Sequence, residues 1–355
     1  MVRKFNMGYK VFDTSQCEEW DAIVCSFSTY DIYYLSGYVK AFEINGDGKA
    51  YLFYYMDETT KAINVFMKRD IATIPYLGES VQFKEYFDIV TPYGYGGFLV
   101  EGDHIHKVCQ AYEEFCMESG IIAEFVRFHP LLQNWSGLEE FYKVQYCGKT
   151  VHMDISNEEA IWHNITSKNR NMIRKAQKAG LKAYWGRENS LIESFMELYH
   201  ETMKRDHASD YYYFKQEFYE SILNDLKYRA MWFYTKLDNE IASISIFLYA
   251  NKSMHYHLSA SKKELQNLAP TNLLLYEAAL WGCENAYEKL HLGGGVGAQE
   301  DSLYQFKKAF NRYEGSSFYV GKRVYNPEVY RNLTELRQKM KGVEMNYEYF
   351  PQYRG

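Results

Sequence analysis

Basic residues gather in the middle of the chain, where they could hold phosphate. Residues 168–187 contain seven lysines and arginines and no aspartate or glutamate. On a helix, Arg170, Arg174 and Lys178 are spaced four residues apart and share one face. The sequence therefore predicts a positive stripe that binds a polyphosphate donor or an RNA backbone. A solvated helix face is the alternative interpretation.

A second segment, residues 91–97, is rich in glycine and tyrosine. Its glycines let a ligand approach the backbone and leave amide donors accessible, and its tyrosines could stack on or hydrogen-bond a sugar or peptide. It lacks the GxxxxGK[ST] and GxGxxG patterns of nucleotide-binding loops. We interpret it as a substrate-binding loop, with a tight strand-to-helix connection as the alternative. The residues concerned are Tyr93, Gly94, Tyr95, Gly96 and Gly97.

A third segment joins glycines to a lysine. Three glycines at residues 293–295 follow a short apolar run, and Phe306 and Lys307 come later on a predicted helix. A strand end followed by glycines and a helix places backbone at a cleft, so Gly294 is expected to contact substrate. A lysine on that helix could meet developing negative charge. The alternative makes Lys307 a surface residue beside a core phenylalanine.

Other chemistries find little support. The six cysteines include no CxxC pair, so they are expected to be reduced and mostly buried. His255 and His257 would share one face of a strand, and His104 and His106 form a second such pair. No third ligand accompanies either pair, so we predict no metal site.

Charge and hydropathy narrow the class of protein. The net charge is −6, which argues against DNA binding. The longest strongly apolar run, residues 241–250, is half of what a bilayer span needs, and the first residues lack a signal core. The sequence predicts a soluble cytoplasmic protein that could still contact a membrane peripherally. It indicates nothing about oligomeric state.

The pattern of apolar residues predicts alternating strands and helices in both halves. The first half contains strands at 49–55 and 62–68, a strand ending at Val90, a helix at 104–119 and a strand at 121–128. The second half contains a strand at 151–155, an N-cap at Ser156, helices near 157–179, 190–206 and 215–227, strands at 231–236, 241–249 and 253–259, a helix at 271–286, a strand at 289–292, a helix from Ser302 and a strand at 317–320.

The two halves share their order of elements. Residues 49–54 (KAYLFY) also resemble residues 229–234 (RAMWFY), which suggests a duplication. We predict an α/β protein with mixed sheets flanked by helices. The predicted domains are residues 1–150 and 151–326, followed by a helical tail at 327–355.

Seven segments resemble the Fem family (FemABX) of peptidoglycan-bridge aminoacyltransferases and the related GNAT-fold acyltransferases of the bacterial envelope. They are residues 91–97, 127–130, 169–176, 202–205, 255–259, 292–295 and 306–307. The resemblance implies two tandem GNAT-like domains, each with a mixed, largely antiparallel sheet flanked by helices, and a cleft between the domains. It also implies an N-acyltransferase that forms an amide on an amine of an envelope precursor, such as a muropeptide or an amino sugar.

The resemblance also implies residue roles. The lysine of the Phe306-Lys307 pair would stabilise the tetrahedral oxyanion, and Arg205 would hold substrate phosphate. No carboxylate or histidine stands out as the base, so Tyr93, Tyr256 or the substrate itself would accept the amine proton.

The donor and the acceptor are less determined. The family's loop often carries an acidic residue where this chain has none before Glu101, which leaves the acceptor open. Residues 265–270 lack the glycines with which GNAT enzymes grip coenzyme A, which favours aminoacyl-tRNA over acyl-CoA as cosubstrate. No tightly bound cofactor is expected. An acyl-CoA-dependent enzyme acting on an amino sugar and a non-catalytic glycan- or RNA-binding module are the alternatives.

Overall fold

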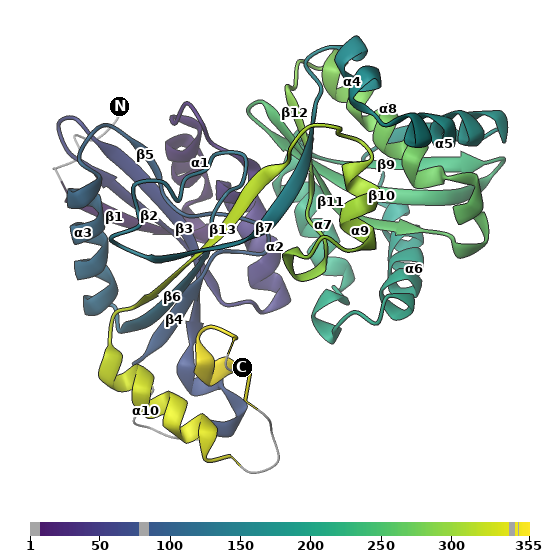
Figure 1. Cartoon of the computed structure of the whole chain (residues 1–355). Coiled ribbons are helices and arrows are strands. Elements are labelled where there is room, and N and C mark those ends of the chain that lie inside the picture. The colour runs from purple at the N-terminus through teal and green to yellow at the C-terminus, as the bar shows by residue number, and fades with distance from the viewer. Residues whose placement is uncertain (1–7, 78–84, 341–344, 347) are drawn as a thin grey trace. The chain divides into compact units, whose positions relative to one another are not determined.

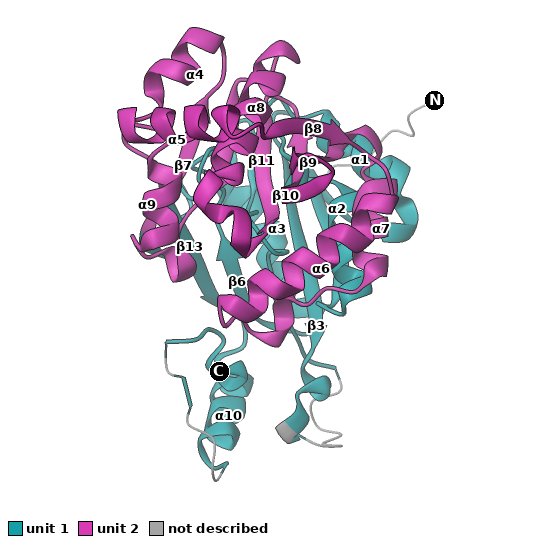
Figure 2. Ribbon diagram, turned by 90° about the vertical axis from the view of Figure 1, so that its right-hand side faces the viewer, with its two compact units in different colours: residues 1–147, 318–355 teal, residues 148–317 magenta. Residues whose placement is uncertain are grey.

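The computed structural model describes residues 8–77, 85–340, 345–346 and 348–355. The chain forms two compact units, residues 1–147 with 318–355 and residues 148–317, which Figures 1 and 2 show along the chain and by unit. Each unit contains one sheet with its own hydrophobic core.

The sheet of the first unit has the strand order β1-β2-β3-β4-β6-β13, with β5 paired to β3. Neighbouring strands are antiparallel except β4 and β6. The elements are β1 (Gly8–Asp13), α1 (Cys17–Cys25), α2 (Ser36–Asn45), β2 (Lys49–Met56), β3 (Lys61–Asp70), β4 (Phe87–Val90), β5 (Leu99–Glu101), α3 (Ile105–Glu118), β6 (Ile121–Arg127), β13 (Ser316–Val324) and α10 (Pro327–Gln338).

The sheet of the second unit has the strand order β7-β12-β11-β10-β9-β8, and only β11 and β12 are parallel. The elements are β7 (Lys143–Asp154), α4 (Glu158–Asn164), α5 (Ser167–Lys178), β8 (Lys182–Gly186), α6 (Ser190–Arg205), α7 (Gln216–Asp225), β9 (Ala230–Leu237), β10 (Glu240–Ala250), β11 (Ser253–Ser261), α8 (Pro270–Glu284), β12 (Lys289–Gly293) and α9 (Ser302–Lys308).

The two sheets have the same topology, which explains the repeated order of elements in the sequence. Each unit has a first strand, two helices, three antiparallel strands, a helix and a parallel strand. The matching segments at residues 49–54 and 229–234 fall on β2 and β9, the second strand of each sheet.

The sixth strand of each sheet comes from outside its own repeat. β7 follows β6 in the chain but pairs with β12, and β13 follows β12 but pairs with β6. The structure therefore divides the chain differently from the sequence-based domains at its C-terminal end. Residues 318–355 belong to the first unit, because the edge of β6 supplies hydrogen bonds for residues 320–324. Chain order alone cannot reveal which sheet edge a strand will join.

Two local predictions differ from the structure. The helix expected at 157–179 is interrupted at Ile165 and forms α4 and α5, because the side chain of Thr166 caps a new helix by accepting from the amide of Asn169. The N-cap of α4 is Asn157 rather than Ser156, and Asn157 accepts from the amide of Ala160.

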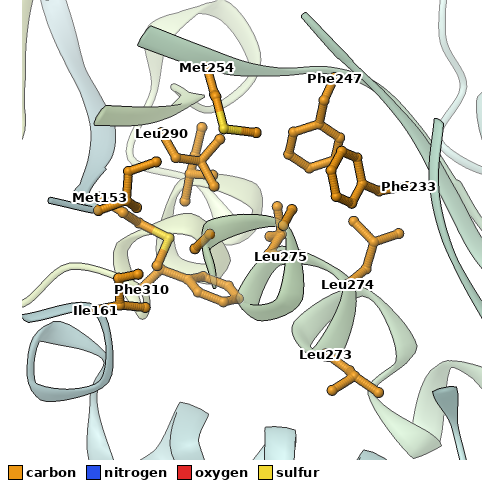
Figure 3. Packing of buried hydrophobic residues seen from close by; sticks show 14 of the residues in the cluster. Met153, Ile161, Phe233, Phe247, Met254, Leu273, Leu274, Leu275, Leu290 and Phe310 are labelled. Atoms are coloured by element: carbon orange, nitrogen blue, oxygen red, sulfur yellow. The ribbon is translucent and has the colours of Figure 1, made fainter. Parts of the chain in front are cut away.

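The core of the second unit lies between the sheet and α8. The helix buries Leu273, Leu274 and Leu275 in succession because the sheet packs on one side of it while α4 and α5 pack on another. Figure 3 shows Leu274 and Leu275 on the side of the helix that faces Phe233 and Phe247, whereas Leu273 points away from these two rings.

Among the helices of the described residues, none combines the length and apolar character that crossing a bilayer requires.

Truncation of the α8 core should destabilise the second unit. Leu275 is 0% exposed, so Leu275→Ala should lower the free energy of unfolding by about 2–5 kcal/mol through lost burial and a cavity. Leu303→Ala is the control, because Leu303 is 40% exposed and its loss should cost less than about 1 kcal/mol. Urea unfolding followed by circular dichroism measures both, and equal losses would contradict this packing.

Candidate functional site

Lys307 lies against the glycine turn that follows β12. The strand ends at Gly293, whose φ of 79° lies in the left-handed region that favours glycine. Asp301 caps α9, which carries Lys307 back toward this turn. The Lys307 ammonium donates to the carbonyl oxygen of Gly294 at 2.7 Å, so the lysine and the glycines predicted to act together do meet.

The ammonium of Lys307 is buried, and no carboxylate of the described residues is in direct contact with it. Its residue is 8% exposed, and burial lowers the lysine pKa to about 8, although Asp301 partly offsets the shift. The carboxylate of Asp301 is held by the amides of Tyr304 at 2.8 Å and Val296 at 3.0 Å. Lys307 therefore uses one N–H on Gly294, and its other two have no partner among the described residues. A buried cation of this kind is costly and marks a candidate functional site.

Phe306 and Tyr256 both pack against the core of the second unit. The Phe306 ring lies 5.6 Å from that of the buried Phe310, which anchors α9. Tyr256 packs against Phe247 with ring centroids 5.6 Å apart. Burial raises the pKa of Tyr256, so its hydroxyl stays protonated near neutral pH and is a donor rather than a base.

The predicted phosphate-binding arginines have different surroundings. Arg170 donates to the carbonyl oxygens of Trp162 at 3.2 Å and Ile165 at 3.1 Å, so its guanidinium stabilises the end of α4. Arg174 and Lys178 are exposed, and the guanidinium of Arg174 lies 5.1 Å from the Trp162 ring. Two of the three predicted cations therefore remain open to a ligand.

Arg205 is the last residue of α6. Its Nε lies 3.5 Å from a carboxylate oxygen of the neighbouring Asp206. Because Asp206 is exposed, this pair is a weak one and leaves the guanidinium accessible to another anion.

The first turns of α5 and α8 are joined by a contact to which the sequence analysis gave no role. Asn272 Nδ2 donates to Oδ1 of the buried Asn169 at 2.6 Å. Before α8, Ala269 adopts a left-handed conformation with φ 59°, and Pro270 begins the helix without a side-chain cap. A left-handed turn therefore precedes this helix although residues 265–270 contain no glycine.

A β-bulge changes the expected arrangement of the histidines on β11. Phe247 pairs with Tyr256 and Ile246 pairs with Leu258, so His257 is the extra residue. Burial and nearby His255 lower the pKa of His257 to about 3, which keeps its imidazole neutral. The two histidines therefore do not follow the regular alternation that the sequence analysis assumed.

The glycine loop of the first unit is fixed by an arginine. Arg127 at the end of β6 donates to the carbonyl oxygens of Thr91 at 2.9 Å, Pro92 at 2.7 Å and Gly94 at 3.0 Å. Its own carbonyl accepts from the amide of Gly96 at 2.8 Å. The loop carbonyls are thus turned toward the protein.

Two glycines of the same loop adopt left-handed conformations. Gly94 and Gly97 have φ values of 96° and 89°, and their N–H groups have no partner in the part of the chain that the structure describes. A Cβ at Gly94 would lie 2.4 Å from the Tyr33 ring, so only glycine fits there. Asn134 Nδ2 holds the carbonyl oxygens of Gly96 and Phe98 at 2.9 and 3.0 Å.

Aromatic residues and a buried contact between His129 and Asp31 also support the loop. The carbonyl of Tyr93 accepts from the hydroxyl of Tyr38 at 2.5 Å, and the Tyr95 ring lies 5.7 Å from that of His129. His129 Nε2 lies 3.0 Å from a carboxylate oxygen of Asp31, and its Nδ1 accepts from the amide of Leu131. We assign the ring proton to Nε2 on this pattern. The segment at residues 127–130 was the only sequence signal for this support.

The predicted residues therefore fall into two sets. Tyr93, Gly94, Tyr95, Gly96 and Gly97 belong to the first unit. The second unit carries Arg170, Arg174, Lys178, Arg205, Tyr256, Gly294, Phe306 and Lys307.

The comparisons agree with this architecture. A family model described as an acetyltransferase (GNAT) domain matches residues 167–308, which lie within the second unit. The crystal structure of FemX aligns with a TM-score of 0.66 at 15% identity, covering 92% of this chain and 99% of FemX. The chain has the fold of FemX. The predicted α/β class and the Fem-like resemblance are thereby confirmed at the level of fold.

Two further structures share this fold. A conserved protein of unknown function from Bacteroides thetaiotaomicron has a TM-score of 0.58 at 11% identity and covers 90% of this chain and 100% of its own. The C-terminal domain of a putative lysylphosphatidylglycerol synthetase from Agrobacterium fabrum has a TM-score of 0.53 at 12% identity, covering 89% of this chain and 94% of that domain. A search of curated sequences finds no match.

Adding a methyl group beside the ammonium should change the titration of Lys307. In Gly293→Ala the new Cβ would lie 3.4 Å from Nζ and exclude water, so the lysine pKa should fall further below its ordinary value. Gly297→Ala is the matched control, because Gly297 is also left-handed at φ 59° but its Cβ would meet nothing within 4 Å. Both changes should cost about 1–2 kcal/mol in backbone strain.

The pH dependence of Lys307 labelling by an amine-reactive reagent, read by mass spectrometry, gives this pKa. An unchanged pKa in Gly293→Ala, or an equal shift in Gly297→Ala, would contradict the close approach of the glycine to the ammonium.

Proposed function

We propose that this chain is an N-acyltransferase that forms an amide on an amine-bearing precursor of the cell envelope, with an aminoacyl ester as donor. Support comes from the GNAT domain match, the fold shared with FemX and the chemistry around Lys307. The acceptor class and the donor come from the resemblance to the Fem family.

The observation that carries the proposal is the buried ammonium with two unused N–H groups. A tetrahedral intermediate places negative charge on the former carbonyl oxygen. A donor already desolvated and held by Gly294 stabilises that charge with little reorganisation. The nearby Asp301 lies close enough to keep the pKa from falling further, but its oxygens are occupied by backbone amides.

The reaction needs little covalent help from the protein. The amine nitrogen bonds to the donor carbonyl carbon, and the C=O electron pair moves onto oxygen beside Lys307. Collapse of this intermediate breaks the bond to the tRNA ribose oxygen, and the amine proton passes to that leaving oxygen. We favour a substrate-assisted transfer because burial keeps the Tyr256 hydroxyl protonated.

We assign acceptor binding to the glycine loop of the first unit. The amides of Gly94 and Gly97, which have no partner among the described residues, suit the oxygens of a phosphate or peptide carboxylate, and Arg127 fixes the loop that carries them. Arg205, Arg174 and Lys178 are the proposed contacts for further phosphates of the precursor or the donor. A small-molecule or lipid-linked precursor fits this assignment, with tRNA as the donor's carrier.

A second function is favoured by a different observation. The left-handed turn at Ala269 precedes an uncapped α8, and the matched family is an acetyltransferase family. These features suit an acyl-CoA donor, because uncapped helix amides can bind a pyrophosphate.

Calorimetric titration with coenzyme A separates the two donors. If the donor is an aminoacyl ester, coenzyme A should show no saturable micromolar binding to the full chain. Micromolar binding that is lost in the presence of an acyl-CoA competitor would overturn the aminoacyl donor and establish the acyl-CoA enzyme.

The charge of Lys307 should govern the rate. Because the ammonium is the active form and burial lowers its pKa to about 8, kcat/KM should fall as pH rises through about 8. Lys307→Arg keeps a positive charge at all these pH values, so this decline should disappear. Lys307→Met should lower kcat by about 100- to 1,000-fold, the usual effect of losing one oxyanion donor. Amide product is measured by mass spectrometry with aminoacyl-tRNA and acyl-CoA donors.

The stability of Lys307→Met is the control. The lysine pKa is lower in the folded protein than its ordinary 10.5, so burying the charge costs stability below pH 8, and this cost fades between pH 8 and 10.5. Lys307→Met should therefore gain up to about 3 kcal/mol at pH 7 while losing activity. A variant that folds and stays fully active would refute the assignment, and ligand binding without amide product from any donor would favour the binding module.

A further inference from the structure

A cavity of about 550 Å³ opens in the first unit, and the sites described above use none of the residues that line it. Its volume falls in the range of small-ligand sites. Seven described residues line it: Arg69, Ile74, Pro75, Arg337, Met340, Tyr349 and Arg354.

The cavity is built where the C-terminal segment returns to the sheet. α10 packs against β6, and the turn at Gln352–Arg354 packs against α10, as can be followed near the C label of Figure 1. Beneath them lies a small core that includes Ile74, Leu333 and Tyr353. The residues that line the cavity are therefore carried by elements that pack against one another.

A fully buried carboxylate orients two of the arginines. Asp88 accepts from Arg69 Nε at 2.6 Å, from Arg354 Nε at 2.5 Å and from the hydroxyl of Tyr353 at 3.0 Å. Each guanidinium donates from its Nε to Asp88, so its two terminal nitrogens remain for other acceptors. One terminal nitrogen of Arg354 donates to the carbonyl oxygen of Asp70. Both terminal nitrogens of Arg69 have no partner among the described residues.

The third arginine approaches from the helix. Arg337 of α10 is only 8% exposed, and its Nε donates to the carbonyl oxygen of Gly355 at 2.8 Å. Three guanidinium groups thus line the cavity, and two of them, those of Arg69 and Arg354, share the carboxylate of Asp88.

We propose that this cavity binds the phosphate group of an organic phosphate ester. Guanidinium groups pair with phosphate oxygens through parallel N–H donors, and Arg69 has two terminal nitrogens without a partner among the described residues.

The rest of the lining explains why the ligand is an ester rather than the free ion. Ile74, Pro75, Met340 and the half-exposed Tyr349 add apolar surface beside the arginines. The phosphate binds at the guanidinium groups, and the organic part of the ester packs on these side chains.

The test uses the full chain and sn-glycerol 3-phosphate as probe. At matched ionic strength, the melting temperature in saturating glycerol phosphate should be about 3 °C higher than in sodium chloride, because only the folded state has the cavity. Calorimetry should give a saturable isotherm.

Met340→Glu places a carboxylate in the lining without touching the arginine contacts to Asp88, and should weaken binding at least tenfold. Met340→Gln, of similar shape and neutral, is the matched control and should retain binding.

Equal effects of chloride and glycerol phosphate, or undiminished binding in Met340→Glu, would overturn the proposal. Co-sedimentation with vesicles of phosphatidylglycerol, compared with phosphatidylcholine, distinguishes the sources. Binding to phosphatidylglycerol vesicles that Met340→Glu abolishes identifies a lipid headgroup, and binding of soluble glycerol phosphate alone identifies a small metabolite. The outcome is independent of Lys307, because every residue tested belongs to the other unit.

Discussion

The hydrogen bond from the buried Lys307 ammonium to the Gly294 carbonyl is the interaction on which the candidate site depends. An ammonium removed from water needs compensation, and here it receives one carbonyl and a neighbouring carboxylate that does not touch it. The cost of this arrangement persists in the folded state, which is typical of residues retained for function rather than for stability. The left-handed Gly293 permits it by leaving no side chain beside the ammonium.

The duplicated topology gives one chain two candidate sites of different chemistry. Both sheets have the same strand order and the same single parallel pair, yet their parallel strands lead to different chemistry. In the second unit the strand β12 ends in glycines that meet a lysine. In the first unit the strand β6 ends in Arg127, which holds a glycine loop by its carbonyls. The sixth strand of each sheet follows the other repeat in the chain: β13 pairs with β6, and β7 pairs with β12.

The cations of this protein separate into those already satisfied and those that remain available. Arg127 and Arg170 are neutralised mainly by backbone carbonyls, so they position loops and helix ends. Lys307 and Arg69 keep N–H groups without protein partners in the described part of the chain, although both are largely buried. Because burial strengthens electrostatic interactions, these unused donors are the groups expected to meet anionic ligands.

The sequence by itself determined the elements and their repetition. Apolar periodicity placed most strands and helices within a few residues of their observed ends, and the likeness of residues 49–54 to 229–234 located equivalent strands. It also singled out Lys307 with its glycines, because a strand end, glycines and a following helix are adjacent in the chain. The short helices α1 and α2 and the edge strand β1 lacked a long enough pattern to be predicted.

Only the tertiary structure decided which strand joins which sheet, what each cation contacts and where the arginines of the C-terminal segment meet β3. Arg69 and Arg354 are separated by most of the chain, yet one carboxylate, Asp88, holds both. No local pattern encodes such a meeting, because burial and partner choice depend on groups brought together from distant parts of the sequence. The same reason separates the structural Arg170 from the exposed Arg174, which are identical in type and one helical turn apart.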